Sequence, residues 1–141
     1  MPPLFEFVFL IRQWRANGRI RISQEALHFV TGNFLNRIPV FNQEECYQSF
    51  IDILATLLSE WPCKLIAWVL MPDHLHLIVN PQDGRIREFT GKLKSLSAKA
   101  IIQAAHGVVF KIDSEGSLHV WQESFKATPL WSAWMIWQKI N

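Results

Sequence analysis

Residues 65–80 constrain the fold of this chain more than any other stretch, because they form its most apolar run. The run nevertheless holds Asp73, His74 and His76, three polar groups that are costly to bury without partners. β-favouring residues lie on both sides of a Pro-Asp turn signal at residues 71–73. We therefore expect a strand, a tight turn and a second strand that carries the histidines.

Alternation along the second strand places His74 and His76 on one face, with Leu75 and Leu77 on the other. The two histidine Cα atoms then lie roughly 7 Å apart, so both imidazoles can reach one divalent ion. A packed pair of histidines is the competing interpretation of an isolated His-x-His. Asp73 reads as a turn residue, with a third metal ligand or an outer partner of His74 as alternatives. We predict His74 and His76 as metal ligands.

The composition indicates a globular protein, because half of the 141 residues are hydrophobic. No apolar run reaches about 18 residues, so we expect no transmembrane helix, and the apolar N-terminus lacks the features of a signal peptide. Two cysteines, Cys46 and Cys63, are too few for a disulfide framework or a zinc knuckle. A cytoplasmic protein with reduced thiols is the expectation.

The distribution of charge says more than the net charge of +2. Basic residues gather in two places, before the first predicted strand and after the histidine segment. Such patches suit the phosphate backbone of a nucleic acid, with an ordinary solvated surface as the alternative. The candidate DNA-binding residues are Arg15, Arg19, Arg21, Lys92, Lys94 and Lys99.

The remaining elements follow from local signals. Asn17-Gly18 indicates a hairpin turn, and Asn42 with Glu45 indicates a capped helix start. Thr128 and Pro129 indicate the start of a closing helix, which is cut off at residue 141 without a capping signal, so we expect it to be truncated. The expected elements are strands over 26–31 and 118–125, and helices over 42–59, 86–105 and from 128 onward.

This order of elements predicts an α+β fold. Helices would pack on one face of an antiparallel sheet in a ferredoxin-like arrangement, with His74 and His76 on a central strand. The other face of such a sheet is where a shallow site can form.

Residues 71–79, Met-Pro-Asp-His-Leu-His-Leu-Ile-Val, resemble the signature of the REP-associated tyrosine transposases and the IS200-like HUH single-strand transposases. Further segments resemble this family in the same order. Residues 28–31 and 38–41 are similar to its first strand and loop, 93–99 to its second helix, and 120–125 to its Trp-Gln motif. The resemblance implies a single transposase-like domain over residues 1–141, with residues 1–20 as a variable N-terminal extension.

The resemblance also implies a chemistry. Two histidines hold Mg²⁺ or Mn²⁺, and a tyrosine from the following helix attacks a phosphate of single-stranded or hairpin DNA. Here that helix contains no tyrosine, because the only one, Tyr47, lies on the earlier predicted helix. Ser97 stands at the position expected for the nucleophile, and Gln103 is the candidate third metal ligand.

Three functions follow as hypotheses. The first is a transposase-like protein that binds single-stranded or hairpin DNA and carries out metal-assisted cleavage and rejoining in DNA transposition. The second is a DNA-binding protein of the same fold that lacks the tyrosine nucleophile and is not an enzyme. The third is a small metal-dependent hydrolase that uses His74 and His76 with a bound water. We expect DNA as the partner, no membrane association, and a homodimer as a candidate assembly.

Overall fold

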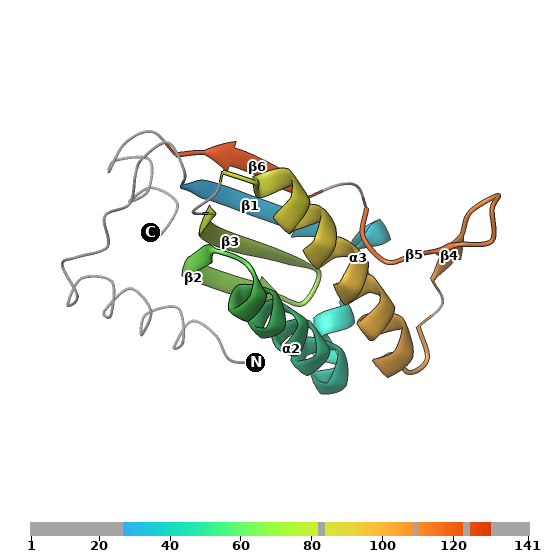
Figure 1. Cartoon of the computed structure of the whole chain (residues 1–141). Coiled ribbons are helices and arrows are strands. Elements are labelled where there is room, and N and C mark those ends of the chain that lie inside the picture. The colour runs from blue at the N-terminus through green and yellow to red at the C-terminus, as the bar shows by residue number, and fades with distance from the viewer. Residues whose placement is uncertain (1–26, 82–83, 109, 123–124, 131–141) are drawn as a thin grey trace.

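A computed structural model describes residues 27–81, 84–108, 110–122 and 125–130 of the chain. Four strands form an antiparallel sheet in the order β2-β3-β1-β6, and helices α2 and α3 cover one face (Figure 1). The predicted α+β class is therefore confirmed. The main elements are β1 (His28–Asn33), α2 (Glu44–Glu60), β2 (Cys63–Met71), β3 (His74–Pro81), α3 (Ile86–Ala104) and β6 (Lys126–Pro129).

Short elements complete the described chain. Two 3-10 turns, η2 (Leu35–Arg37) and η3 (Val40–Asn42), connect β1 to α2. After α3, a small hairpin pairs β4 (Lys111–Ile112) with β5 (Leu118–His119) and lies apart from the main sheet (Figure 1).

The hairpin of β2 and β3 is the strand, turn and strand expected from residues 65–80. Met71 pairs with His74 across the two-residue turn, and the pairing continues to Cys63 opposite Pro81. The turn is also held from outside, because the backbone N–H of Phe34 donates to the carbonyl of Asp73 at 3.0 Å. β1 pairs with the other side of β3, so the histidine strand lies inside the sheet, as predicted.

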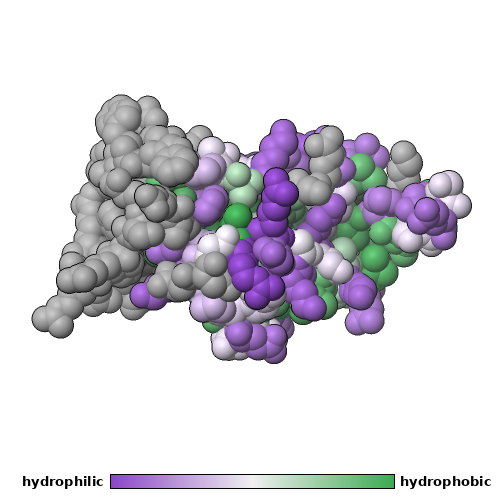
Figure 2. Space-filling model, turned by 45° about the horizontal axis from the view of Figure 1, so that its top comes forward, coloured by the Kyte–Doolittle hydropathy of each residue, from purple (hydrophilic) through white to green (hydrophobic). Residues whose placement is uncertain are grey.

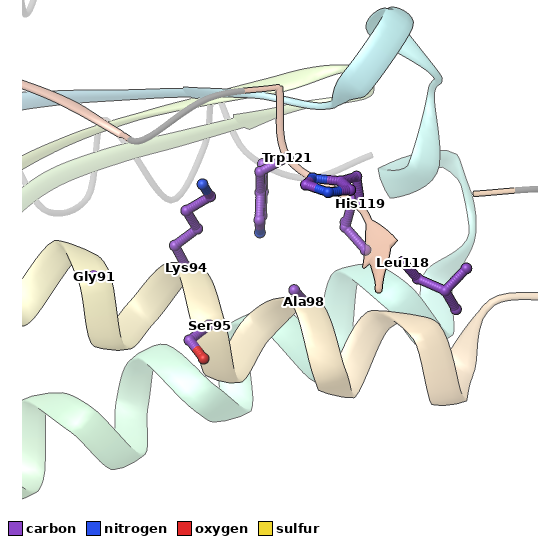
Figure 3. A pocket seen from close by; sticks show the side chains of 8 residues that line it. Gly91, Lys94, Ser95, Ala98, Leu118, His119 and Trp121 are labelled. Atoms are coloured by element: carbon purple, nitrogen blue, oxygen red, sulfur yellow. The ribbon is translucent and has the colours of Figure 1, made fainter. Parts of the chain in front are cut away.

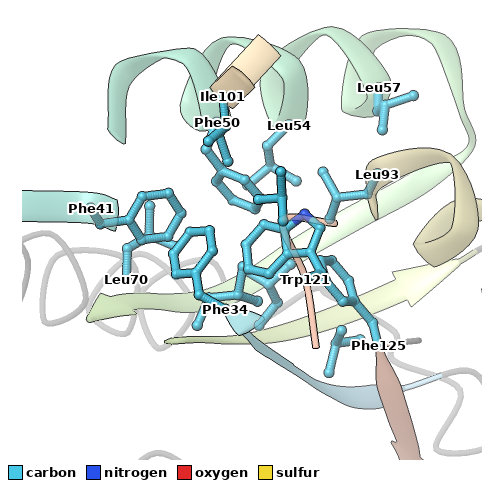
Figure 4. Packing of buried hydrophobic residues seen from close by; sticks show 14 of the residues in the cluster. Phe34, Phe41, Phe50, Leu54, Leu57, Leu70, Leu93, Ile101, Trp121 and Phe125 are labelled. Atoms are coloured by element: carbon cyan, nitrogen blue, oxygen red, sulfur yellow. The ribbon is translucent and has the colours of Figure 1, made fainter. Parts of the chain in front are cut away.

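The core lies between the sheet and the two helices and is rich in aromatic rings (Figure 4). Trp121 is at its centre, 2% exposed, and stacks on Phe34 with ring centroids 4.2 Å apart. Leu75 and Leu77 of β3 enter the same core. Burying each such side chain contributes about 1.5–3 kcal/mol, which fixes the leucine face of β3 toward the helices.

The start of α2 differs from the predicted capping box. Asn42 belongs to η3, and Gln43 is the N-cap, although its side chain caps no backbone N–H of α2. The Gln43 amide instead donates to the carbonyl of His106 at 2.7 Å and accepts from the His106 backbone N–H at 2.8 Å. The predicted cap was wrong because Asn42 is part of the 3-10 turn η3, so that α2 begins one residue later than a cap at Asn42 would place it.

The predicted start of a closing helix at Thr128 is also wrong, because residues 126–129 form β6 and pair with β1. Pro129 ends this edge strand, a position where a missing N–H costs little. The strand expected over 118–125 is shorter, since β5 ends at His119 and Trp121 makes only an isolated bridge to Phe34. The hairpin at residues 17–18 and the helix beyond residue 130 lie outside the described residues.

Candidate metal centre

His74 and His76 project from the face of the sheet opposite the helices. Leu75 and Leu77 are 0% and 1% exposed on the core side, so the alternating histidines point the other way. The two imidazole rings lie with centroids 5.0 Å apart and planes at 74°. Both side chains are half-buried, which keeps them within reach of solvent. The predicted shared face is therefore confirmed.

Each imidazole is oriented through its Nδ1 atom. His74 Nδ1 donates to the Asp73 carboxylate at 2.7 Å, and His76 Nδ1 lies 3.2 Å from the Thr31 hydroxyl. Thr31 is the residue of β1 directly opposite His76, so the pairing of the strands places this partner. A histidine fixed at Nδ1 by a carboxylate or a hydroxyl binds metal through Nε2, with its ring orientation set beforehand.

Asp73 is itself held on its second oxygen. Arg37 Nε lies 3.1 Å from Asp73 Oδ2, and Arg37 Nη1 donates to the Asn33 side chain at 2.6 Å. The hydrogen bond from His74, and then the charge of Arg37, lower the pKa of Asp73 below its ordinary value. Asp73 is thus an ionised outer partner of His74, the second of the alternatives derived from the sequence.

No group of three or more His, Cys, Asp or Glu side chains gathers anywhere in the part of the chain that the structure describes. Gln103, the predicted third ligand, is exposed near the end of α3, in the layer on the other side of the sheet. The structure does not bring it to the histidines. Two oriented imidazoles fit a divalent ion that takes its remaining ligands from water and from a bound phosphate.

Ser97 is also separated from the histidines. It is 0% exposed, donates to the carbonyl of Lys94 at 3.1 Å and accepts from Trp121 Nε1 at 3.1 Å. These bonds place its hydroxyl in the core between α3 and the sheet. Tyr47 lies in the same layer, on α2, edge-on to Phe41. The geometry gives Ser97 a structural role and brings neither hydroxyl to the histidine pair.

The predicted DNA-binding lysines lie on α3, where Lys92 and Lys99 are exposed and Lys94 is half-buried. Lys94 lines a groove of about 260 Å³ whose opposite wall includes His119 and Trp121 (Figure 3). Hydrophilic side chains dominate much of the described surface in the view of Figure 2. The other predicted residues, Arg15, Arg19 and Arg21, lie outside the described residues.

Three residues that surround the histidines were not predicted from the sequence: Thr31, Asn33 and Arg37. Thr31 and Asn33 are located by the register of β1 against β3, where they face His76 and His74. Arg37 is located by the η2 turn that follows β1. Each of the three lies 37 or more positions before His74, so only the folded arrangement of the chain could reveal them.

The fold and the site together define a class. This is an α+β protein with an antiparallel sheet, helices on one face and a pair of oriented histidines on the other. A family profile described as "Transposase IS200 like" matches residues 22–134, most of the chain. The chain therefore belongs to the IS200-like transposase family.

Solved structures share the fold. A REP-associated tyrosine transposase bound to a REP hairpin superimposes with a TM-score of 0.64 and 18% identity, over 86% of this chain and 66% of that one. A candidate transposase from Deinococcus radiodurans R1 gives a TM-score of 0.59 and 23% identity, over 80% of this chain and 84% of that one. No curated protein sequence matches the chain. None of the helices among the described residues is long and apolar enough to cross a membrane.

Proposed function

We propose that this chain binds single-stranded or hairpin DNA and holds a divalent ion, Mg²⁺ or Mn²⁺, between His74 and His76. The observation that carries the proposal is the pair of imidazoles on one sheet face, each oriented at Nδ1 by a neighbouring oxygen. Membership of the IS200-like family supports it. The hairpin bound to a protein of the same fold supports the choice of DNA.

The residues of the site have separate tasks in this proposal. His74 and His76 supply two nitrogen ligands, while Asp73 and Thr31 fix the orientation of the rings. A divalent ion held by these histidines would supply Lewis-acid polarisation of a phosphodiester, as in other metal-assisted reactions of nucleic acids. Metal-assisted cleavage and rejoining of DNA in transposition is the activity that this arrangement suits best.

A second candidate is a protein that binds DNA and metal without forming a covalent intermediate. It is favoured by the positions of Ser97 and Tyr47, which lie in the helix layer on the other side of the sheet from the histidines. Cleavage and rejoining without an external energy source need a side-chain nucleophile that keeps the energy of the phosphodiester in a covalent link. Water-mediated nicking is the third possibility, and it leaves free DNA ends.

One gel separates the three functions. The protein is incubated with Mn²⁺ and a DNA hairpin that carries a single-stranded tail, and the products are run under denaturing conditions. A protein–DNA adduct supports cleavage and rejoining, whereas cut DNA without an adduct supports hydrolysis. Uncut DNA together with a retained gel shift supports the binding protein. Absence of any gel shift overturns the proposal.

The metal pair is tested separately by calorimetry with Mn²⁺. His76→Ala should abolish measurable binding, because a single imidazole remains. His106→Ala is the matched control, since His106 is an exposed histidine beyond the end of α3. Equal Mn²⁺ affinity in both variants would show that the ion, if any binds, lies elsewhere.

A further inference from the structure

Two cations that no sequence motif indicated share the histidine face of the sheet. Residues directly opposite each other in antiparallel strands point to the same face. His76 of β3 is opposite Thr31 of β1, and Thr31 is opposite Lys126 of β6. The row therefore runs from the metal pair to the edge strand and ends in a lysine.

Lys126 is within reach of a strand bound at the histidines. Two steps between neighbouring strands separate the Cα atoms of His76 and Lys126 by about 10 Å, since each step is about 4.5–5.5 Å. A lysine side chain extends several ångströms beyond its Cα and carries a flexible point charge. Lys126 is exposed, and among the described strands it lies on β6, the edge strand of the sheet. Its ammonium group can meet a phosphate next to the one at the metal.

Arg37 lies at the other end of the histidine pair, beside His74. Its side chain is 54% exposed although Nε and Nη1 are engaged by Asp73 and Asn33. A guanidinium has five N–H donors, so these contacts fix its plane and leave donors for a further anion. Asn36 and Arg37 both have φ of 56°, a left-handed conformation that is unfavourable for residues other than glycine. The turn thus keeps a strained backbone that aims Arg37 at the histidine site.

The described strands place no acidic side chain on the same face of the sheet. Among the residues of the four described strands that point away from the helices, none is Asp or Glu. Asp73 lies in the turn, and its negative charge is balanced by its ion pair with Arg37. A DNA backbone lying across this face would therefore meet cations and neutral groups, while Lys92 and Lys99 lie in the layer on the other side of the sheet.

We propose that Lys126 and Arg37 contact backbone phosphates of a DNA strand that lies across the sheet face, with the histidine pair between them. The inference rests on the proposed DNA-binding function and names where the strand lies. In this arrangement the phosphates nearest the proposed metal site contact side chains of the sheet layer and not the lysines of α3.

The salt dependence of DNA binding tests the proposal. The probe is a DNA hairpin with a single-stranded tail, and its affinity is measured by fluorescence anisotropy at several KCl concentrations. A plot of log K against log salt has a negative slope. Each lost phosphate contact makes this slope less steep by about 0.7 for single strands. The double variant Lys126→Gln/Arg37→Gln should therefore reduce the steepness of the slope by about 1.4, and each single variant by about half of that. Lys126→Arg should restore the wild-type slope.

The comparison double variant, Lys92→Gln/Lys99→Gln, removes the same amount of positive charge from α3. The proposal requires a larger fall in slope for the sheet pair, and an equal or larger fall for the helix pair overturns it. Lys126→Gln alone should keep the Mn²⁺ affinity and the melting temperature of the wild type, because Lys126 contacts neither histidine. An unchanged salt slope in this folded variant also overturns the proposal. If wild-type protein binds no DNA at all, the proposed function fails first, so the two failures are distinguishable.

Discussion

Ser97→Ala isolates one buried hydrogen bond and tests two interpretations of the same residue. The substitution removes the hydroxyl that accepts from Trp121 Nε1 at 3.1 Å, where both residues are almost fully buried. A buried donor left without a partner costs about 1–3 kcal/mol. Alanine's higher helix propensity returns about 0.5 kcal/mol, so the net loss should be about 0.5–2.5 kcal/mol. For a chain of this size the melting temperature should fall by about 2–8 °C.

Urea unfolding measures the free energy of unfolding of each variant. A double-mutant cycle with Trp121→Phe tests whether the loss comes from the hydrogen bond between Ser97 and Trp121. In the Trp121→Phe background the indole donor is already absent, so Ser97→Ala should cost clearly less than in the wild type. If the protein forms a covalent adduct with DNA, Ser97→Ala should retain it, because this hydroxyl faces the core. Wild-type stability in Ser97→Ala would refute the structural role, and loss of an adduct in the folded variant would restore Ser97 as a nucleophile.

Three further predictions concern other parts of the fold. Gly32→Ala should destabilise the protein by about 1–3 kcal/mol, because the added Cβ would lie 2.7 Å from a ring carbon of Phe125. Phe125→Leu should relieve part of this loss. Full additivity of the two substitutions in the free energy of urea unfolding would contradict the explanation. Asp73→Asn should weaken Mn²⁺ binding about 10–100-fold in calorimetry, and unchanged affinity would rule out its orienting role. The hydrogen bond from His119 lowers the pKa of Asp113, so its stabilisation is present above the ordinary carboxyl pKa and is lost as pH falls through the lowered value. An NMR titration of Asp113 to an ordinary pKa would contradict this.

The elements that the sequence predicted well are those whose pattern is local. Alternation in residues 74–77 predicted both the strand and its two faces, because leucines and histidines differ so strongly in the cost of burial. The helical spacing of Phe89, Leu93 and Ile101 located α3 to within one residue at its end, and all three are fully buried. The histidine pair was found for the same reason, since its two members are neighbours in sequence.

The parts that the sequence did not predict depend on contacts between distant segments. Thr31 becomes the partner of His76 only through the β1–β3 register, across 45 positions. The buried Ser97 hydroxyl has a partner in Trp121, 24 positions later, which donates to it. Thr128 and Pro129 suit a helix start and the end of an edge strand equally well, and pairing with β1 decides between them.

The alternation of leucine and histidine along β3 has a consequence for how the protein can be monitored. A slip of β3 by one residue would send both imidazoles into the core and expose both leucines, so the proposed ion site would exist only in the native register. An ion that binds only the native state adds about 2.7 kcal/mol to the free energy of unfolding at a concentration 100 times its dissociation constant. Mn²⁺ would then serve as a reporter of correct strand pairing, readable as a rise in melting temperature before any DNA is added.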